Sequence, residues 1–292
     1  MHAQDSGATG VLGRMMDALT SQDNPYRSKV YSMSGISKLV EGSVPPSVIG
    51  TDGVVRFSQY DELSDTLHEM TSHQAESVFA DTYASILANA LESTERLGAQ
   101  LAAVELQGNY GGGTGMEHIA RIMALDHSVH ESERDAFMVQ IATFDAHQNP
   151  PHMDINMHLG NFNTDLEALH TDLVALNLWD ATTIVSISDF GRTITSNGIG
   201  TDHGWGGNNF IIGGSVKGRR VHGVFPDDVN PATSELEVGR GRGVFVPTTP
   251  WEGMWYGLAQ WFGVDESRML DVVPNAANFP DSALHTADEL FN

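Results

Sequence analysis

A helical stretch between two apolar runs constrains the fold of this chain most strongly. Residues 137–144 form an apolar run of strand length, and residues 182–188 form a second run that is rich in β-branched residues. Between them, apolar side chains step by four and three positions from Phe162 to Leu176, which predicts a helix with one buried face. This order predicts a βαβ unit with two parallel strands and a right-handed crossover.

The remaining apolar spacing predicts a mixed α/β fold. Residues 1–60 are interpreted as loops and short elements, and residues 265–292 as a largely irregular tail after a domain at 1–264. We therefore expect one mostly parallel sheet flanked by helices. Further helices are predicted at 11–19, 75–97, 116–125 and 251–262, and a further strand at 208–213.

The charge balance is strongly acidic and excludes several classes of partner. The chain has 38 Asp and Glu residues against 15 Lys and Arg residues, which gives a formal net charge of -23. Such a surface repels nucleic acid and anionic lipid, so we expect neither as a partner. Solubility is the simplest explanation for the excess of acid, and a high-salt setting or divalent cations are alternatives.

The absence of cysteine narrows the chemistry further. Disulfides, thiolate zinc sites and thiol nucleophiles are excluded, so carboxylate, imidazole and backbone oxygen must hold any metal. No apolar run approaches the roughly 20 residues of a membrane span. The first residues also lack the charged and apolar regions of a signal peptide.

Acidic and histidine residues follow both predicted strands. Asp145 and Asp189 come directly after them, and parallel strands would bring these carboxylates to one edge of the sheet. His147 lies two residues after Asp145, so the two side chains project to one face of an extended chain. Carboxylate and imidazole together suit zinc, iron or manganese. A surface loop is the alternative for the Asp-X-His triplet, and a helix cap or turn is the alternative for Asp189.

The glycine-rich segment after the second strand adds three candidates. Arg192 is a rare basic residue that could neutralise Asp189 or offer a planar fork to a phosphate or sulfate oxyanion. Neighbouring residues of an extended chain point opposite ways, so His203 is predicted as a metal ligand, and Asp202 either as the partner that supports a ligand or as a turn residue. The alternative is a glycine-rich hairpin with a surface histidine.

Two other features are interpreted as structural rather than functional. The glycines at 109–115 could form a backbone anion nest but lack the Lys-Ser/Thr ending of a phosphate loop, which favours a plain loop. Four histidines lie in polar stretches that favour surface positions, namely His127, His130, His152 and His158.

Five motifs together resemble a known bacterial family. They are Phe144-Asp-Ala-His147, Ser188-Asp-Phe-Gly-Arg-Thr193, Gly200-Thr-Asp-His-Gly204, Gly213-Gly-Ser-Val-Lys-Gly218 and Trp261-Phe-Gly-Val264. Their order and spacing are similar to those of the family called domain of unknown function 1501, a relative of alkaline phosphatases and sulfatases. The likeness extends from about His2 to Val264.

The resemblance implies an alkaline-phosphatase-like fold with a metal centre at the sheet edge. One divalent metal (zinc, manganese, iron or calcium) would be held by Asp145 and His147, and another by Asp189 and His203. Relatives often carry histidine after the second acid, where this chain has Phe190. Family members also begin with an exported leader, a first strand with a metal-binding aspartate and a nucleophile region, which this chain is expected to lack.

Two functions follow from these expectations. One is a metal-dependent hydrolase of small phosphate or sulfate esters, in which Arg192 steadies the anion. The other is a non-catalytic binding or assembly protein of the same fold. In that case a bare sheet edge, left where the first strand would lie, would pair with another protein or with a second copy of the chain.

Overall fold

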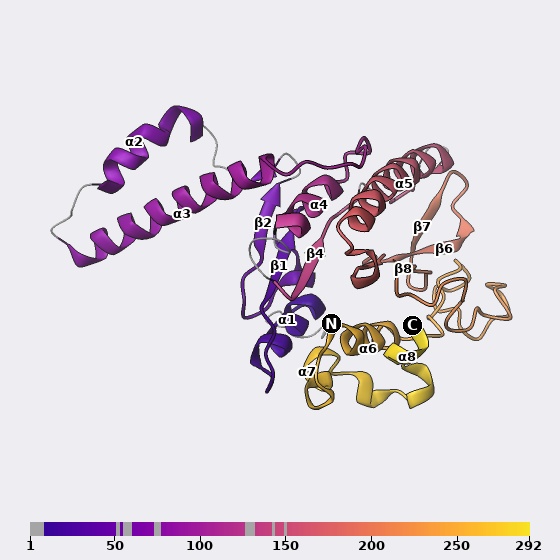
Figure 1. Cartoon of the computed structure of the whole chain (residues 1–292). Helices are drawn as coiled ribbons and strands as arrows, with labels where there is room; N and C mark the ends of the chain where they lie inside the picture. The colour runs from indigo at the N-terminus through magenta and orange to yellow at the C-terminus, as the bar shows by residue number, and fades with distance from the viewer. Residues whose placement is uncertain are drawn as a thin grey trace.

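The protein combines a small parallel sheet, two small antiparallel sheets and helices that cover them. The computed structural model describes residues 9–50, 53–54, 60–72, 77–125, 132–141, 144–148 and 151–292. Figure 1 shows the first sheet and its helices beside α5 and the antiparallel strands, with the C-terminal helices packed beneath both. Within the described residues, no helix combines the length and hydropathy that a membrane span needs.

The first sheet has the strand order β3-β2-β1-β4. Its strands are β1 (Ser28–Ser32), β2 (Ser47–Gly50), β3 (Gly53–Val54) and β4 (Arg134–Met138). The pairs β1–β2 and β1–β4 are parallel, and β2–β3 is antiparallel.

The elements before residue 60 are short, as expected, but three of them are strands, which were not predicted from the sequence. Strand β1 lies in the middle of the sheet, with Val30 in one hydrophobic cluster and Tyr31 in another on the opposite face. Three of its five residues are polar (two serines and a lysine), so the strand does not stand out as an apolar run in the sequence.

The predicted parallel pairing across the βαβ unit is wrong. Strand β5 (Thr183–Val185) pairs antiparallel with β8 (Ile211–Gly213), and β4 pairs with β1 instead. The helix between them, α5 (Pro151–Ala175), has the predicted place in the order but begins earlier than predicted. A cavity of about 240 Å³ is lined by side chains of both β4 and β5, including Met138 and Ile184, so the two strands face a shared space rather than each other's backbone.

Most predicted helices are confirmed. Helices α1, α4 and α6 lie where the apolar spacing predicts them, and α3 extends beyond the predicted C-terminal end. The C-terminal residues, predicted to be largely irregular, instead form short helices. The bounds are α1 (Val11–Ser21), α2 (Tyr60–Ser72), α3 (Val78–Ala102), α4 (Met116–Leu125), α6 (Trp251–Phe262), α7 (Met269–Val272) and α8 (Ala287–Leu290), with short 3-10 turns at Lys38–Val40, Trp179–Ala181, Glu266–Arg268, Ala276–Asn278 and Asp281–Ala283.

Methionine and the C-terminal residues contribute much of the core. The largest cluster joins α1, α6 and α7, where Met16 and Met269 are almost fully buried. A second cluster covers the end of the chain, where the ring of Phe291 stacks on Trp261 with centroids 4.7 Å apart. Buried residues before and after Val264 belong to the largest cluster. The segment after Val264 therefore packs against α1 and α6 as part of the core.

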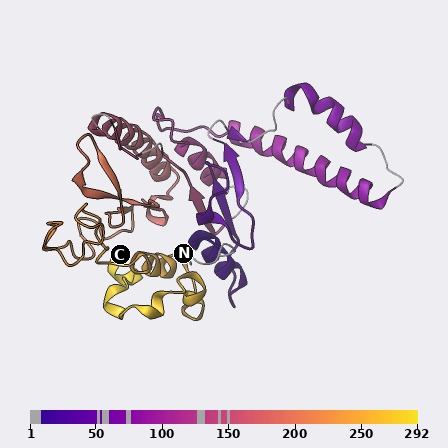
Figure 2. The ribbon, with the colours of Figure 1, turned by 180° about the vertical axis from the view of Figure 1, so that it is seen from behind.

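Helices α2 and α3 form an arm that extends away from the rest of the molecule (Figures 1 and 2). The base of α3 packs on the first sheet and α4 through Leu97 and Leu101. Toward the outer end of the arm, Phe79 and Tyr83 are largely exposed.

Candidate metal centre

A β-hairpin carries most of the candidate centre. Strands β6 (Gly191–Ser196) and β7 (Thr201–Gly204) pair antiparallel, and Arg192 lies directly opposite His203. Residues opposite each other in an antiparallel pair project from the same face of the sheet. The hairpin therefore presents a guanidinium and an imidazole side by side.

A close backbone contact joins this hairpin to the loop that contains Asp145. The N–H of Thr201 donates to the carbonyl of Ala146 at 3.2 Å. A side chain at Gly200 would place its Cβ only 2.3 Å from that carbonyl oxygen, so glycine is required for this approach. The contact brings two segments more than fifty residues apart into one site.

Three side chains with metal-binding atoms meet there. Asp145 Oδ1 lies 2.9 Å from Nε2 of His147 and 3.0 Å from Nε2 of His203. One ligand atom from each residue lies within 4.8 Å of the other two. The side chains are 32%, 40% and 50% exposed for Asp145, His147 and His203, so the site is open to solvent on one side.

Neighbouring residues fix the orientation of both imidazoles. Nδ1 of His147 lies 3.3 Å from Oδ1 of Asp202, which also accepts a hydrogen bond of 3.0 Å from the side chain of Asn197. The ring of Phe190 stacks on His203 with centroids 3.8 Å apart and planes 7° from parallel. Asp202 thus lies against the imidazole of His147.

The guanidinium of Arg192 holds the carboxylate of Asp145. Its Nη1 donates to Asp145 Oδ1, its Nε donates to Thr201 Oγ1 at 2.9 Å, and its Nη2 donates to the carbonyl of Thr201. The contact with Asp145 means that this arginine is directed at the carboxylate rather than at solvent. Its first role in the described geometry is therefore to position Asp145.

Local hydrogen bonds keep both acids ionised. Partial burial acts to raise the pKa of Asp145, but hydrogen bonds from Arg192 and His203 outweigh it, so the pKa lies below its ordinary value. The hydrogen bonds from Asn197 and His147 likewise lower the pKa of Asp202. Both carboxylates are therefore available as anions at neutral pH.

The donor set fits a divalent transition metal. Two imidazole nitrogens and one carboxylate oxygen match the three protein ligands of many catalytic zinc sites, which leave a further position open. A metal-binding histidine commonly donates its second N–H to a carboxylate, and Asp202 stands in that position for His147. With the proton of His147 on Nδ1, its Nε2 would offer a lone pair to a cation bound in the cluster.

Asp189, the fourth predicted ligand, lies outside this group. It is exposed in the bend between β5 and β6, and the described cluster of Asp145, His147 and His203 does not include it. Sequence reasoning missed Asn197 and Thr201, and it singled out Phe190 only as a difference from relatives, without its contact with His203. The only signal that could have suggested Asn197 and Thr201 is that polar side chains lie between the glycines of this segment.

Of the four other histidines singled out in the sequence, only His158 has a described side chain, and it is not part of the cluster. His158 packs against Phe144 with ring centroids 5.6 Å apart. His127, His130 and the side chain of His152 lie outside the described part of the chain.

The glycine-rich loop at 109–115 binds an internal anion. The backbone N–H groups of Gly111, Gly112 and Thr114 donate to the carboxylate of Asp165 at 2.7–3.0 Å, and the Thr114 hydroxyl donates at 2.7 Å. Burial opposes but does not outweigh these bonds, which lower the pKa of Asp165. The loop groups that could have bound a phosphate are therefore already occupied.

Comparison with known proteins assigns the chain to a family without assigning a reaction. No curated protein and no solved structure matches it. The family described as "Protein of unknown function (DUF1501)" matches residues 4–238, which is most of the chain. The protein therefore belongs to the DUF1501 family.

Proposed function

We propose that the protein binds one divalent cation through Asp145, His147 and His203, and that it hydrolyses small phosphate or sulfate esters at this centre. The observation that carries the proposal is the convergence of two imidazole nitrogens on one carboxylate oxygen at 2.9 and 3.0 Å. When bound, the cation supplies the Lewis acidity that polarises an ester oxygen.

Residues of this chain have distinct roles in the proposed site. Asp145 and the two imidazoles hold the cation, while Asp202 orients His147 through its Nδ1. Arg192 fixes the carboxylate of Asp145, and the second N–H groups of its Nη1 and Nη2, which the bonds to Asp145 and Thr201 leave over, would meet an oxyanion bound there. The solvent-facing side leaves an entry path for a small anionic ester. None of the described serine or threonine residues is assigned as a nucleophile.

Elemental analysis tests the cation site directly. After dialysis against zinc or manganese, the wild-type protein should retain about one cation per chain, and His203→Ala should retain far less. His68→Ala is the matched control, because His68 is an exposed histidine on α2 outside the cluster. Equal metal content in His203→Ala and wild type would refute the assignment of ligands.

Turnover tests the hydrolase part separately. The metal-loaded protein should hydrolyse a chromogenic phosphate or sulfate ester, and Arg192→Gln should slow the reaction by at least about a hundredfold, the usual effect of removing one donor to a transition-state oxyanion. Stoichiometric metal without turnover would refute hydrolysis while leaving cation binding intact.

A second candidate function is strand binding, and the space between β4 and β5 favours it. Strand β4 is the last strand of its sheet, and the described pairing of β5 is with β8 alone. Both strands line the cavity of about 240 Å³, and helices supply further apolar walls through Ile119, Trp255 and Leu258. An extended segment of another protein could pair with both edges there if its side chains were apolar on both faces.

Hydrogen exchange tests this candidate. A probe peptide with consecutive valine and isoleucine residues between terminal lysines should slow amide exchange in β4 and β5. Ile184→Asp, which places a charge in the cavity, should abolish the effect, whereas Ile194→Asp on the exposed side of β6 should not. Unchanged exchange in both strands would refute strand binding.

A further inference from the structure

The exposed side of α3 carries an apolar stripe that no described element covers. Its members are Phe79, Tyr83, Ile86 and Ala90, which recur at steps of four, three and four residues. The first three are 89%, 70% and 63% exposed. Alternating steps of three and four keep side chains on one seam of a helix, which is the spacing that helices use to pair with each other.

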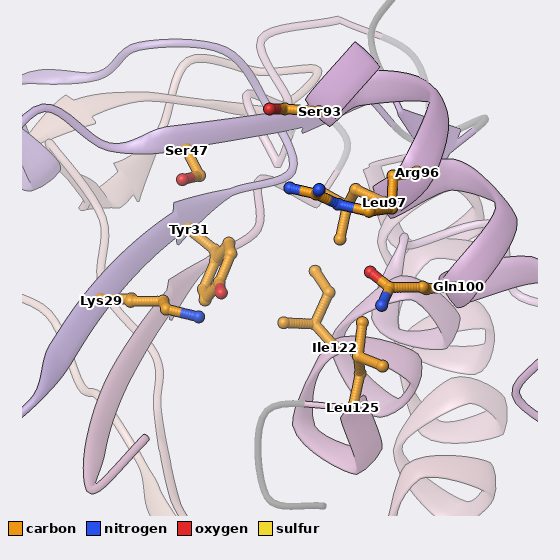
Figure 3. Close-up of a pocket in the computed structure, with 9 residues that line it drawn as sticks. All are labelled: Lys29, Tyr31, Ser47, Ser93, Arg96, Leu97, Gln100, Ile122 and Leu125. Atoms are coloured by element: carbon orange, nitrogen blue, oxygen red, sulfur yellow. The ribbon is translucent and has the colours of Figure 1, made fainter. Parts of the chain in front are cut away.

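The other side of α3 already has a partner. Leu87, Ala88 and Leu91 are less exposed than the stripe, and α2 packs along the same helix. The apolar stripe therefore forms a second face rather than the buried face of a two-helix hairpin. It ends near the base of α3, where Ser93 and Leu97 line a cavity of about 220 Å³ on the first sheet (Figure 3).

Charge identifies the partner that this stripe suits. From Val78 to Leu91 the helix contains one charged residue, Asp81, although charged residues make up 18% of the chain. Asp81 lies two residues after Phe79, which is about 200° around the helix and away from the stripe. Two copies of a chain with net charge -23 repel each other over most of their surface. The stripe itself carries no charge and is therefore a surface on which two copies can meet.

We propose that α3 pairs with α3 of a second copy in an antiparallel, two-fold symmetric contact. In this register Phe79 packs against Ala90 of the partner and Tyr83 packs against Ile86, so that each large ring meets a smaller side chain. The same pairs repeat across the two-fold axis, as an isologous interface requires. The four side chains of each copy would bury roughly 1,000 Å² in total, which is near the lower limit of specific interfaces.

Sedimentation velocity over a concentration series tests the proposal. The wild-type chain should form a dimer that dissociates on dilution, and Tyr83→Glu should shift it to monomer because the carboxylate would face Ile86 of the partner. Val221→Glu is the matched control, since Val221 is a 92% exposed apolar residue outside the arm, and it should leave the dimer intact. Tyr83 is largely exposed, so its replacement should not alter folding, which circular dichroism would verify.

A charge exchange tests the register itself. Combining Tyr83→Glu with Ile86→Lys should restore the dimer, because each new carboxylate would face a new ammonium group of the other copy. A wild-type chain that is monomeric at every concentration, or a dimer that Tyr83→Glu does not weaken, would overturn the proposal. Failure of the double variant to restore the dimer would overturn the antiparallel register. None of these outcomes depends on metal binding or turnover.

Discussion

Replacing Asp165 should destabilise the protein more than any conservative change on its surface. Asp165 is 1% exposed and accepts four hydrogen bonds from the glycine-rich loop. In Asp165→Asn the carboxamide NH₂ would replace the oxygen that accepts from Thr114, so the backbone N–H of Thr114 would lose its acceptor. The remaining donors would face a neutral carboxamide instead of a carboxylate, so those hydrogen bonds would be weaker. Each lost or weakened bond to a buried carboxylate costs roughly 1–3 kcal/mol, so we expect the free energy of unfolding to fall by about 3 kcal/mol.

Urea unfolding followed by tryptophan fluorescence measures this change. Glu167→Gln is the control, because Glu167 is an exposed acid on the same helix and its replacement should change the free energy of unfolding by less than about 0.5 kcal/mol. If Asp165→Asn were as stable as Glu167→Gln, the loop would not depend on this carboxylate and the reasoning would be refuted.

The pH dependence of the free energy of unfolding of the wild type and of Asp165→Asn supplies a second check. The hydrogen bonds from the glycine-rich loop lower the pKa of Asp165 in the folded state, whereas the pKa of an aspartate in the unfolded chain is about 3.9. The carboxylate therefore stabilises the wild type fully above that pH and loses its effect as the pH falls through the lower folded value. The stability difference between wild type and Asp165→Asn should accordingly shrink below about pH 4.

Three further predictions concern the site and the C-terminal segment. Gly200→Val should weaken metal binding by about tenfold or more, because its Cβ would lie 2.3 Å from the Ala146 carbonyl oxygen; a chelator competition titration measures this, and unchanged affinity would contradict it. Asp202→Asn should weaken binding by roughly 10–100-fold in the same titration through loss of the support for His147, whereas full affinity would show that the carboxylate is dispensable. Phe291→Ala should lower the free energy of unfolding by roughly 3–5 kcal/mol in chemical denaturation, and a loss below about 1 kcal/mol would show that the end of the chain is not part of the cooperative core.

Helices with a clear apolar period were predictable from the sequence, whereas helix α2 and the short strands before residue 60 were not. Helices α4 and α6 extend over enough turns for their apolar period to stand out, and both match their predicted bounds. Strand β1 has only five residues, three of them polar, and its place in the sheet depends on distant residues of β4. Pairing between segments more than a hundred residues apart leaves no local pattern.

The candidate site was predictable only in part for the same reason. Asp145, His147 and His203 stood out because metal-binding residue types follow a predicted strand or occupy a glycine-rich turn. The argument that joined Asp189 to them assumed that β4 and β5 are parallel neighbours with a common edge. Since β5 pairs with β8 instead, that assumption fails, and the hairpin supplies the contact to Asp145.

The sequence also contained a sign that Asp165 is buried, although the apolar period of the helix alone did not show how its charge is satisfied. It lies four residues before Leu169, on the apolar side of α5, where an acid requires hydrogen-bond donors. The glycine-rich loop was the available source of such donors. Joining the two observations would have predicted the internal anion.

The methionine-rich core gives this cysteine-free chain a built-in chemical probe of unfolding. Sulfur in the protein is confined to 12 methionines, of which Met16, Met33 and Met269 are at most 2% exposed whereas Met70 and Met157 are more than half exposed. Mild peroxide should convert the exposed thioethers to sulfoxides first and reach the buried ones only when the core opens. Because a sulfoxide is polar, each late oxidation would prevent that molecule from repacking. The order in which methionine peptides gain mass would thus record which part of the core opens first.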